Sequence, residues 1–283
     1  MRAAAAIVAL IVLAAAPAAE QVRFSTRVES VRVDVLATAG SVPVTDLSAA
    51  DFEVRDNGVV QTVALVGNEK APVNLMLALD TSASLSDERL QRLRTACEVL
   101  IGKLLPGESA GLITFSHVVT QRQVLTTELK RVSDALALVE PEGSTSLSDA
   151  VSLGLSLGEQ STGRALLVVF SDGVDTTSWQ SEDIVVASAR RAETVLYGVA
   201  VTPEGGSPRF LRDVADVSGG KVMEVQSNDR LEEAFVRILE EFRQRYLLSY
   251  TPTGVAKPGW HKIEVRVKRR GVTAKARPGY FAR

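Results

Sequence analysis

Three short segments carry the side chains whose types and spacing could bind a metal ion. They are Asp80-Thr81-Ser82-Ala83-Ser84, Gly143-Ser144-Thr145-Ser146 and Ser171-Asp172-Gly173. Together they offer two carboxylates and several hydroxyls, without an imidazole or a thiolate. Such an all-oxygen set suits a hard divalent cation such as Mg²⁺, Mn²⁺ or Ca²⁺. Two carboxylates would balance the charge of the ion, and neutral hydroxyls would leave it electrophilic toward an outside carboxylate.

The elements that position these segments are predicted strands of an open α/β sheet. Val73 to Leu79, Arg164 to Phe170 and Thr194 to Val201 are nearly continuous apolar runs, which are typical of parallel strands covered on both faces. Helical stripes alternate with them, such as the one from Leu90 to Leu104. This alternation predicts a doubly wound, mostly parallel α/β sheet. Ligands bind at the carboxyl ends of strands in such sheets, where Asp80 and Asp172 are expected.

The three segments resemble a known motif, the metal-ion-dependent adhesion site (MIDAS) of von Willebrand factor type A (VWA) domains. The resemblance covers roughly residues 72–243. It implies Asp80, Ser82, Ser84, Thr145 and Asp172 as ligands of a divalent cation, with Mg²⁺ preferred over Mn²⁺ or Ca²⁺. The choice of Thr145 among its neighbouring hydroxyls rests on this resemblance. It further implies helices on both faces of the sheet, one antiparallel edge strand from a hairpin over 110–125, and a partner Glu or Asp on the ion.

The ends of the chain are similar to the secreted bacterial family usually labelled VWFA-related, in DLSAADFEVRDNGVVQ, RYLLSYTP, WHKIEVRV and ARPGYFAR. Alternating apolar residues predict strands there, and Asn57-Gly58 predicts a tight hairpin. We expect residues 19–71 and 244–283 to pair into one sheet or small sandwich beside a VWA domain at 72–243. Basic residues cluster in a predicted C-terminal hairpin. They are interpreted either as a solvated strand face or as a surface that contacts the envelope.

The first residues have the features of a secretory signal peptide. Arg2 precedes an apolar run from Ala3 to Ala16, followed by Ala16-Pro17-Ala18 as a cleavage site. We therefore expect a signal at 1–18 and a secreted or periplasmic protein. No Cys follows the run, so it is not read as a lipoprotein. No apolar run reaches the length of a membrane span.

Several single residues have a structural and a functional interpretation. Asp80, Ser82 and Ser84 could merely cap a helix, although all three segments together favour a metal site. Asp175 is read as a solvated loop acid, with an extra ligand as the alternative. Cys97 lies on a helical stripe and is read as a buried structural thiol.

The two histidines are given structural roles. Ser116 and His117 are adjacent, and neighbours in a strand point to opposite faces, which argues against a nucleophilic pair. His261 is read as a surface or interfacial residue.

Composition and motifs argue against nucleic-acid and nucleotide binding. The 32 Lys and Arg nearly balance 34 Asp and Glu, which argues against a nucleic-acid partner, and no glycine-rich phosphate loop is present. The leading hypothesis is a non-enzymatic, metal-dependent module that binds a partner protein through an Asp or Glu side chain. The alternative is an envelope scaffold that binds through its β domain. The helix from Asp229 to Gln244 leads into the C-terminal strands and could transmit movement from the site.

Overall fold

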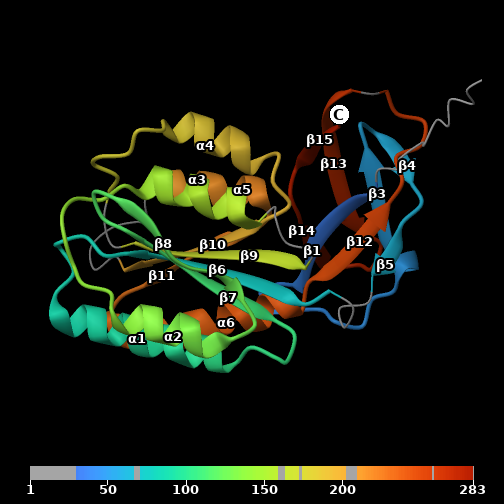
Figure 1. The fold of residues 1–283 in the computed structure, drawn as a ribbon. Helices are drawn as coiled ribbons and strands as arrows, with labels where there is room; N and C mark the ends of the chain where they lie inside the picture. Colours follow the sequence, from blue (N-terminus) through green and yellow to red (C-terminus); the bar gives the residue numbers. More distant parts are fainter. Residues whose placement is uncertain are drawn as a thin grey trace, which may run out of the picture.

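The structure is a computed structural model that describes residues 30–66, 71–158, 163–171, 174–201, 209–256 and 258–282. Within these ranges the chain forms an α/β body with an antiparallel β sandwich beside it (Figure 1). The predicted signal peptide at 1–18 lies outside the described residues. None of the described helices is long and apolar enough to cross a membrane.

The α/β body is built on a six-stranded sheet with the order β11-β10-β9-β6-β7-β8. All neighbours in it are parallel except β7 and β8, which are antiparallel. The doubly wound sheet and its antiparallel edge strand are therefore confirmed. The strands are β6 (Val73–Asp80), β7 (Ser109–Phe115), β8 (Val119–Thr126), β9 (Arg164–Ser171), β10 (Val195–Val201) and β11 (Lys221–Val225).

Helices cover both faces of this sheet (Figure 1). One face packs against α1 (Asp87–Gly102), α2 (Leu129–Ala137) and α6 (Leu231–Arg243). The other packs against α3 (Leu147–Gly158), α4 (Glu182–Ala189) and α5 (Arg209–Ser218). The apolar stripes read from the sequence are the buried faces of these helices, as Leu93 and Phe235 illustrate with 0% exposure each. Cys97 is also buried, and burial raises the pKa of its thiol.

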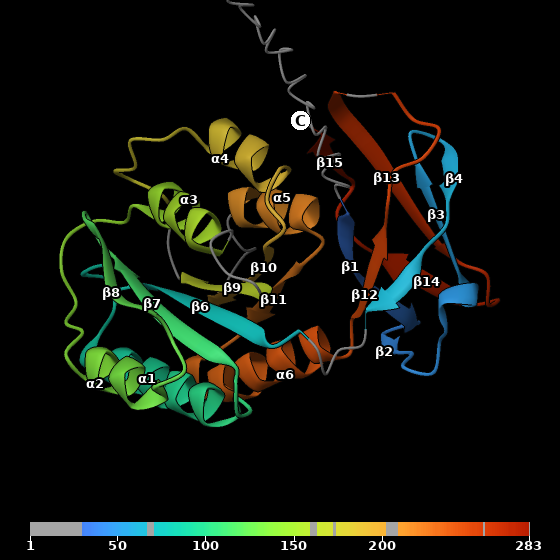
Figure 2. The same cartoon turned by 45° about the vertical axis from the view of Figure 1, so that its right-hand side comes forward.

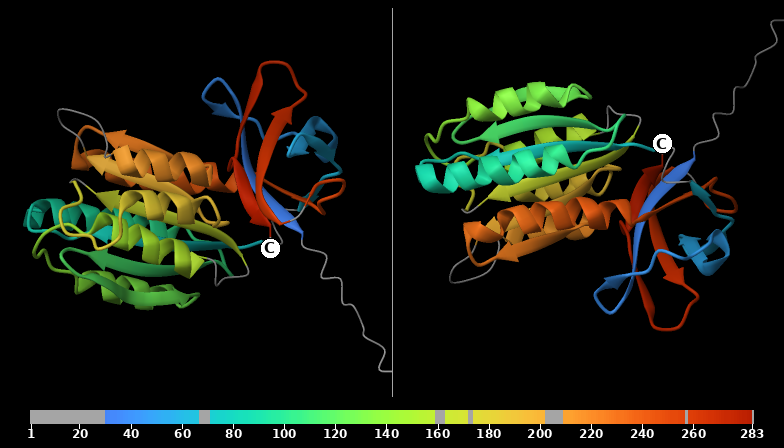
Figure 3. Two further views of the ribbon diagram at one scale, coloured as in Figure 1. Left: turned by 90° about the horizontal axis from the view of Figure 1, so that it is seen from above. Right: turned by 90° about the horizontal axis from the view of Figure 1, so that it is seen from below.

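The flanking segments form two packed sheets, as Figures 2 and 3 show from other sides. One has the order β14-β1-β12-β5, with β2 paired to β1, and the other has the order β15-β13-β3-β4. The strands are β1 (Val31–Ala39), β2 (Val42–Pro43), β3 (Phe52–Asp56), β4 (Val59–Gln61), β5 (Ala64–Val66), β12 (Tyr246–Tyr250), β13 (Gly259–Val267), β14 (Val272–Lys275) and β15 (Gly279–Ala282). A flanking antiparallel domain built from both ends of the chain is thus confirmed.

The apolar run from Val59 to Leu65 forms two strands, β4 and β5, which pair in different sheets. One detail of the prediction for these segments is wrong. The expected C-terminal hairpin does not form, because β13 pairs with β3 and β15 while β14 pairs with β1. A short turn between strands therefore crosses from one sheet to the other, a connection that local periodicity does not distinguish from a hairpin.

His261 is buried in the sandwich, contrary to the surface reading. Its exposed fraction is 1%, and its Nδ1 lies 2.7 Å from Oδ1 of the fully buried Asp56. The hydroxyls of Tyr250 and Tyr280 donate to Oδ2 of the same carboxylate at 3.0 and 2.8 Å. Burial and the nearby Asp56 charge raise the pKa of Tyr250. A polar side chain can occupy an inward position when it is hydrogen-bonded, and Asp56 and Tyr280 both lie within hydrogen-bond distance of Nδ1 of His261.

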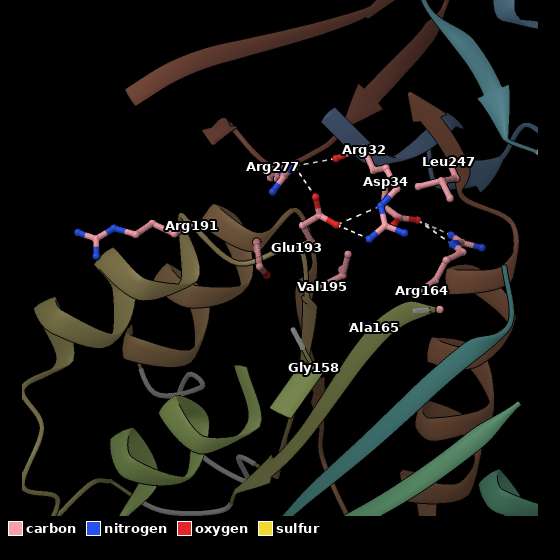
Figure 4. Close-up of a pocket in the computed structure, with 12 residues that line it drawn as sticks. Arg32, Asp34, Gly158, Arg164, Ala165, Arg191, Glu193, Val195, Leu247 and Arg277 are labelled. Carbon is pink, nitrogen blue, oxygen red and sulfur yellow. Dashed lines mark hydrogen bonds and ion pairs between the residues drawn. The ribbon is translucent and has the colours of Figure 1, made fainter. Parts of the chain in front are cut away.

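The body and the sandwich meet through ion pairs around a cavity of about 270 Å³ (Figure 4). Arg164 at the start of β9 is 4% exposed, and its Nε donates to Oδ1 of Asp34 in β1 at 3.0 Å. Arg32 bonds Glu193 at 2.7 Å, and Arg277 donates to the carbonyl of Arg32, also at 2.7 Å. Because the sandwich contacts the first residue of β9, it lies at the amino edge of the parallel strands, and the carboxyl edge faces away.

Candidate metal centre

Asp80 occupies the last position of β6 and is held from two sides. Its side chain is 1% exposed. Oδ1 accepts a hydrogen bond from the Ser82 amide at 3.0 Å, and Oδ2 accepts one from the Ser171 hydroxyl at 2.7 Å. An ionised carboxylate has about four acceptor positions, so these bonds orient Asp80 and are compatible with a cation on it.

The loop after β6 places two hydroxyls beside each other. Ser82 Oγ and Ser84 Oγ are 2.9 Å apart; Ser82 is 3% exposed and Ser84 is exposed. The cap of α1 is a different residue, Ser86, whose hydroxyl accepts from the Arg89 amide at 3.4 Å. The capping alternative for Ser82 and Ser84 is therefore wrong, and their hydroxyls are directed to each other.

The second segment is bound to the first through the backbone. The Ala83 amide donates to the Gly143 carbonyl at 3.0 Å, and the Glu142 amide donates to the Thr81 carbonyl at 2.7 Å. Thr145 lies two residues further and is 7% exposed. Of its neighbours, Ser146 directs its hydroxyl to Thr177 at 2.9 Å. The structure thus brings Asp80, Ser82, Ser84 and the Thr145 segment to one edge of the sheet.

The fifth residue implied by the resemblance, Asp172, lies outside the described residues, as does Gly173. Its neighbour Ser171 is fully buried at the end of β9, the strand that pairs with β6. Among the described residues, no group of three or more His, Cys, Asp or Glu side chains is gathered for a metal. The ligand set that the resemblance implies differs from such a group, since it combines two carboxylates with three hydroxyls.

Two residues of this edge were misread or missed. Asp175, read as a solvated acid, is half-buried and accepts from the amides of Ser148 at 2.7 Å and Ser178 at 3.0 Å. Burial acts to raise its pKa, but the hydrogen bonds from Ser178 and Ser148 outweigh this effect and lower it. Ser171, quoted only as part of its segment, is the donor that orients Asp80. The sequence carried no signal for the bonds from Ser148 and Ser171, because these donors are distant in the chain from the carboxylates they bind, whereas Ser178 is only three residues from Asp175.

Ser116 and His117 lie in the turn between β7 and β8, so the argument from strand alternation was wrong. Ser116 Oγ and His117 Nδ1 face each other at 3.4 Å. This distance is longer than the roughly 2.6–3.2 Å expected between an activated nucleophile and its general base. The His117 ring instead packs over Gly143, whose absent Cβ would lie 2.1 Å from Nδ1.

These observations define a class of domain: an open α/β sheet with an oxygen-rich site on loops at its carboxyl edge. Residues 75–174 match the family model of the von Willebrand factor type A domain. The chain thus contains a VWA domain, and its α/β body has the VWA fold.

Individual relatives are distant. The chain is 24% identical over 132 residues to inter-alpha-trypsin inhibitor heavy chain H4 of Sus scrofa, a match that covers 43% of this chain and 14% of that protein. The structure of a von Willebrand factor type A protein from Catenulispora acidiphila aligns with a TM-score of 0.56 at 13% identity, over 92% of this chain and 65% of that one.

Proximal thread matrix protein 1 from the mussel byssus, described with a zinc-occupied MIDAS motif, aligns with a TM-score of 0.55 at 15% identity. That alignment covers 66% of this chain and 49% of that one. At such low identities, these structures show that the fold is shared.

Proposed function

We propose that the chain is an exported protein-binding module that uses a divalent cation to capture a carboxylate of a partner protein. Asp80, Ser82, Ser84, Thr145 and Asp172 would hold the cation. One observation carries the proposal: two backbone hydrogen bonds join the loop of Asp80 to the segment of Thr145, at the carboxyl edge of the sheet. A bound cation would supply an electrophilic position for an outside carboxylate.

The residues of the site have separate roles in this proposal. Asp80 supplies charge and is oriented by Ser171. Ser82, Ser84 and Thr145 supply neutral oxygens. These do not reduce the charge of the cation, so the cation keeps a high affinity for an anionic ligand. The two carboxylates of the protein would balance the charge of the cation, and the cation would bind a third carboxylate from the partner. Binding rather than catalysis is proposed, because the hydroxyl that lies within reach of the Asp80 carboxylate, that of Ser171, is fully buried and not open to a substrate.

The test is titration calorimetry of the metal-stripped protein with Mg²⁺, Mn²⁺, Ca²⁺ and Zn²⁺. Saturable one-site binding is expected for the wild type and its loss for Asp80→Ala, with circular dichroism showing that the variant remains folded. Asp134→Ala is the matched control, because Asp134 is an exposed acid on α2 that pairs only with a neighbouring Lys130 in the described contacts. Equal binding by Asp80→Ala and wild type would contradict the proposal.

The alternative is an envelope scaffold that binds through its β domain, and several basic residues of that domain already have partners within the protein. Lys262 pairs with Glu264, Arg269 with Asp46 and Lys275 with Asp216. Arg277 is buried at the joint. Partner capture that survives both chelation and Asp80→Ala would nevertheless favour the scaffold.

A further inference from the structure

Trp179 is an almost fully solvent-exposed aromatic residue on a loop near the candidate metal centre. Its exposed fraction is 96%, in the loop between β9 and α4. A tryptophan offers about 150–250 Å² of surface, and exposed apolar area of this kind is a feature of binding sites. Val174, in the same loop, is 73% exposed.

The backbone that presents Trp179 is fixed rather than loose. The amides of Trp179 and Gln180 donate to the two carboxylate oxygens of Asp149, each at 2.9 Å. Asp175 binds the amide of Ser178, as described above. A side chain on a fixed backbone loses little conformational freedom when it binds, which favours a role in recognition.

The same loop is joined to the segment of the candidate ligand Thr145. The amides of Thr176 and Thr177 donate to the Thr145 carbonyl at 2.9 and 3.2 Å. On the other side, the Ser146 amide donates to the Ser116 carbonyl in the β7–β8 turn at 2.8 Å. That turn presents Val118, which is 53% exposed.

Val118, Val174 and Trp179, here termed the apolar rim, therefore border the candidate centre from two sides. The strand order places β6, which ends in Asp80, between β9 and β7. The loop that follows β9 carries Val174 and Trp179, and the turn that follows β7 carries Val118. A partner that reaches Asp80 from solvent meets this rim on both sides.

Charge on the surrounding loops restricts the partner further. Residues 81–89, 140–146 and 174–183, which comprise loop residues and the first turns of α1 and α4, contain seven acidic residues and a single basic one, Arg89. The acids are Asp87, Glu88, Glu140, Glu142, Asp175, Glu182 and Asp183. A polyanion would be repelled by this ring, whereas a basic surface would be attracted.

We propose that the apolar rim binds a protein partner in which one exposed Asp or Glu is flanked by an apolar side chain that covers Trp179 and by basic residues that face the acidic loops. This inference rests on the proposed function, because the partner carboxylate is placed on the same cation. It adds what the metal site alone does not specify: which residues must accompany that carboxylate.

The experiment uses a phage-displayed peptide library with a fixed central Glu and randomised flanks, selected on the protein in Mn²⁺ and eluted with a chelator. Enrichment of Lys or Arg, and of a large apolar residue at a constant offset from the Glu, is expected. The affinity of a selected peptide should fall about tenfold or more in Trp179→Ala and less in Trp179→Phe, as at an aromatic hot spot. Leu105→Ala, an exposed apolar residue preceding β7 at the opposite edge, is the control and should change nothing.

A second measurement reads the contact directly. The chain has two tryptophans, so Trp260→Phe leaves Trp179 as the sole emitter. Peptide binding should shift its emission to shorter wavelength and protect it from iodide. Unchanged folding of Trp179→Ala is checked by its thermal midpoint.

The outcomes separate the two proposals. Selected peptides that need metal and Asp80 but are indifferent to Trp179→Ala would overturn the rim and leave the proposed function standing. Peptides enriched in acidic flanks would overturn the charge argument. No enrichment in Mn²⁺ over chelator would contradict both proposals. Concentration-dependent dimerisation lost in Trp179→Ala would show that a second copy of the chain covers the rim.

Discussion

The amide of Ala83 donates a 3.0 Å hydrogen bond to the carbonyl of Gly143, and this contact joins two loops that lie far apart in the sequence. One loop carries Ser82 and Ser84, and the other carries Thr145. Hydroxyls bind a cation weakly on their own, so their usefulness depends on being held together beside a carboxylate. The backbone between them is therefore as important to the candidate centre as the side chains.

Gly143 tests this dependence. Its φ is +64°, and a Cβ there would lie 2.1 Å from Nδ1 of His117. Gly143→Ala should therefore cost about 1–2 kcal/mol from the left-handed backbone, with a further cost from displacing the imidazole. Metal affinity, measured by calorimetry, should fall with it.

The same substitution in a His117→Ala background separates the two causes. Removing the imidazole should restore part of the stability lost in Gly143→Ala, measured by urea unfolding, but not the part due to φ. Equal losses in both backgrounds would show that the ring is not packed as described.

The position of Asp80 could be predicted from the sequence because it depends on a local feature. Asp80 follows an apolar run, so its place at the end of a parallel strand follows from periodicity. The bonds that hold it do not, since Ser171 reaches Asp80 from a different strand. Asp175 was misread for the same reason: a polar residue in a loop is usually solvated, and only the fold shows that the amide of Ser148 lies within reach.

The β sandwich shows a second limit. The alternation of apolar and polar residues predicted β13 as a strand but did not predict which strands pair with it. The pattern within a strand is the same whichever strand lies beside it. His261 continues the inward alternation of Ile263, although it was read as a surface or interfacial residue. Its burial depends on Asp56, which comes from the distant β3. Polar residues that satisfy each other across the chain are read as exposed when each is considered alone.

Asp175 should make a pH-dependent contribution to stability. Its folded pKa is lowered from the ordinary 3.8, so the contribution is fully present above about pH 4 and is lost as the pH falls through the lower folded value. Asp175→Ala should cost about 1.5–3 kcal/mol at neutral pH, the range for hydrogen bonds to a charged group. Urea unfolding at pH 7 and near pH 3 measures the difference, which should shrink in acid. A pH-independent difference would contradict the bonding described.

The joint between body and sandwich should show strong coupling between Asp34 and Arg164 (Figure 4). Their side chains are 12% and 3% exposed. Asp34→Asn should cost about 3–5 kcal/mol, because it leaves a buried guanidinium without its carboxylate. Adding Arg164→Met should cost much less than the sum of the single changes.

The control for this cycle is Arg32→Gln, since Arg32 pairs with Glu193 at the exposed side of the joint and should contribute about 0–1 kcal/mol. Urea unfolding of the four chains of the cycle measures the coupling. Additive losses from Asp34→Asn and Arg164→Met would mean that the two side chains do not act as a pair.

Helix α6 offers a route by which the site could affect the sandwich, and hydrogen exchange tests it. The helix follows β11 at the carboxyl edge and ends at Arg243, two residues before Arg245. Arg245 is fully buried and donates to the carbonyls of Gly219 in the body at 2.8 Å and Asp34 in the sandwich at 3.1 Å. A shift of α6 would have to move this guanidinium, and β12 begins at the next residue. We therefore predict slower amide exchange in Tyr246–Tyr250 when a selected peptide and Mn²⁺ are bound, with Asp80→Ala as the control that should show no change. Identical exchange of β12 with and without peptide would mean that the sandwich is a rigid support, uncoupled from binding at the opposite edge.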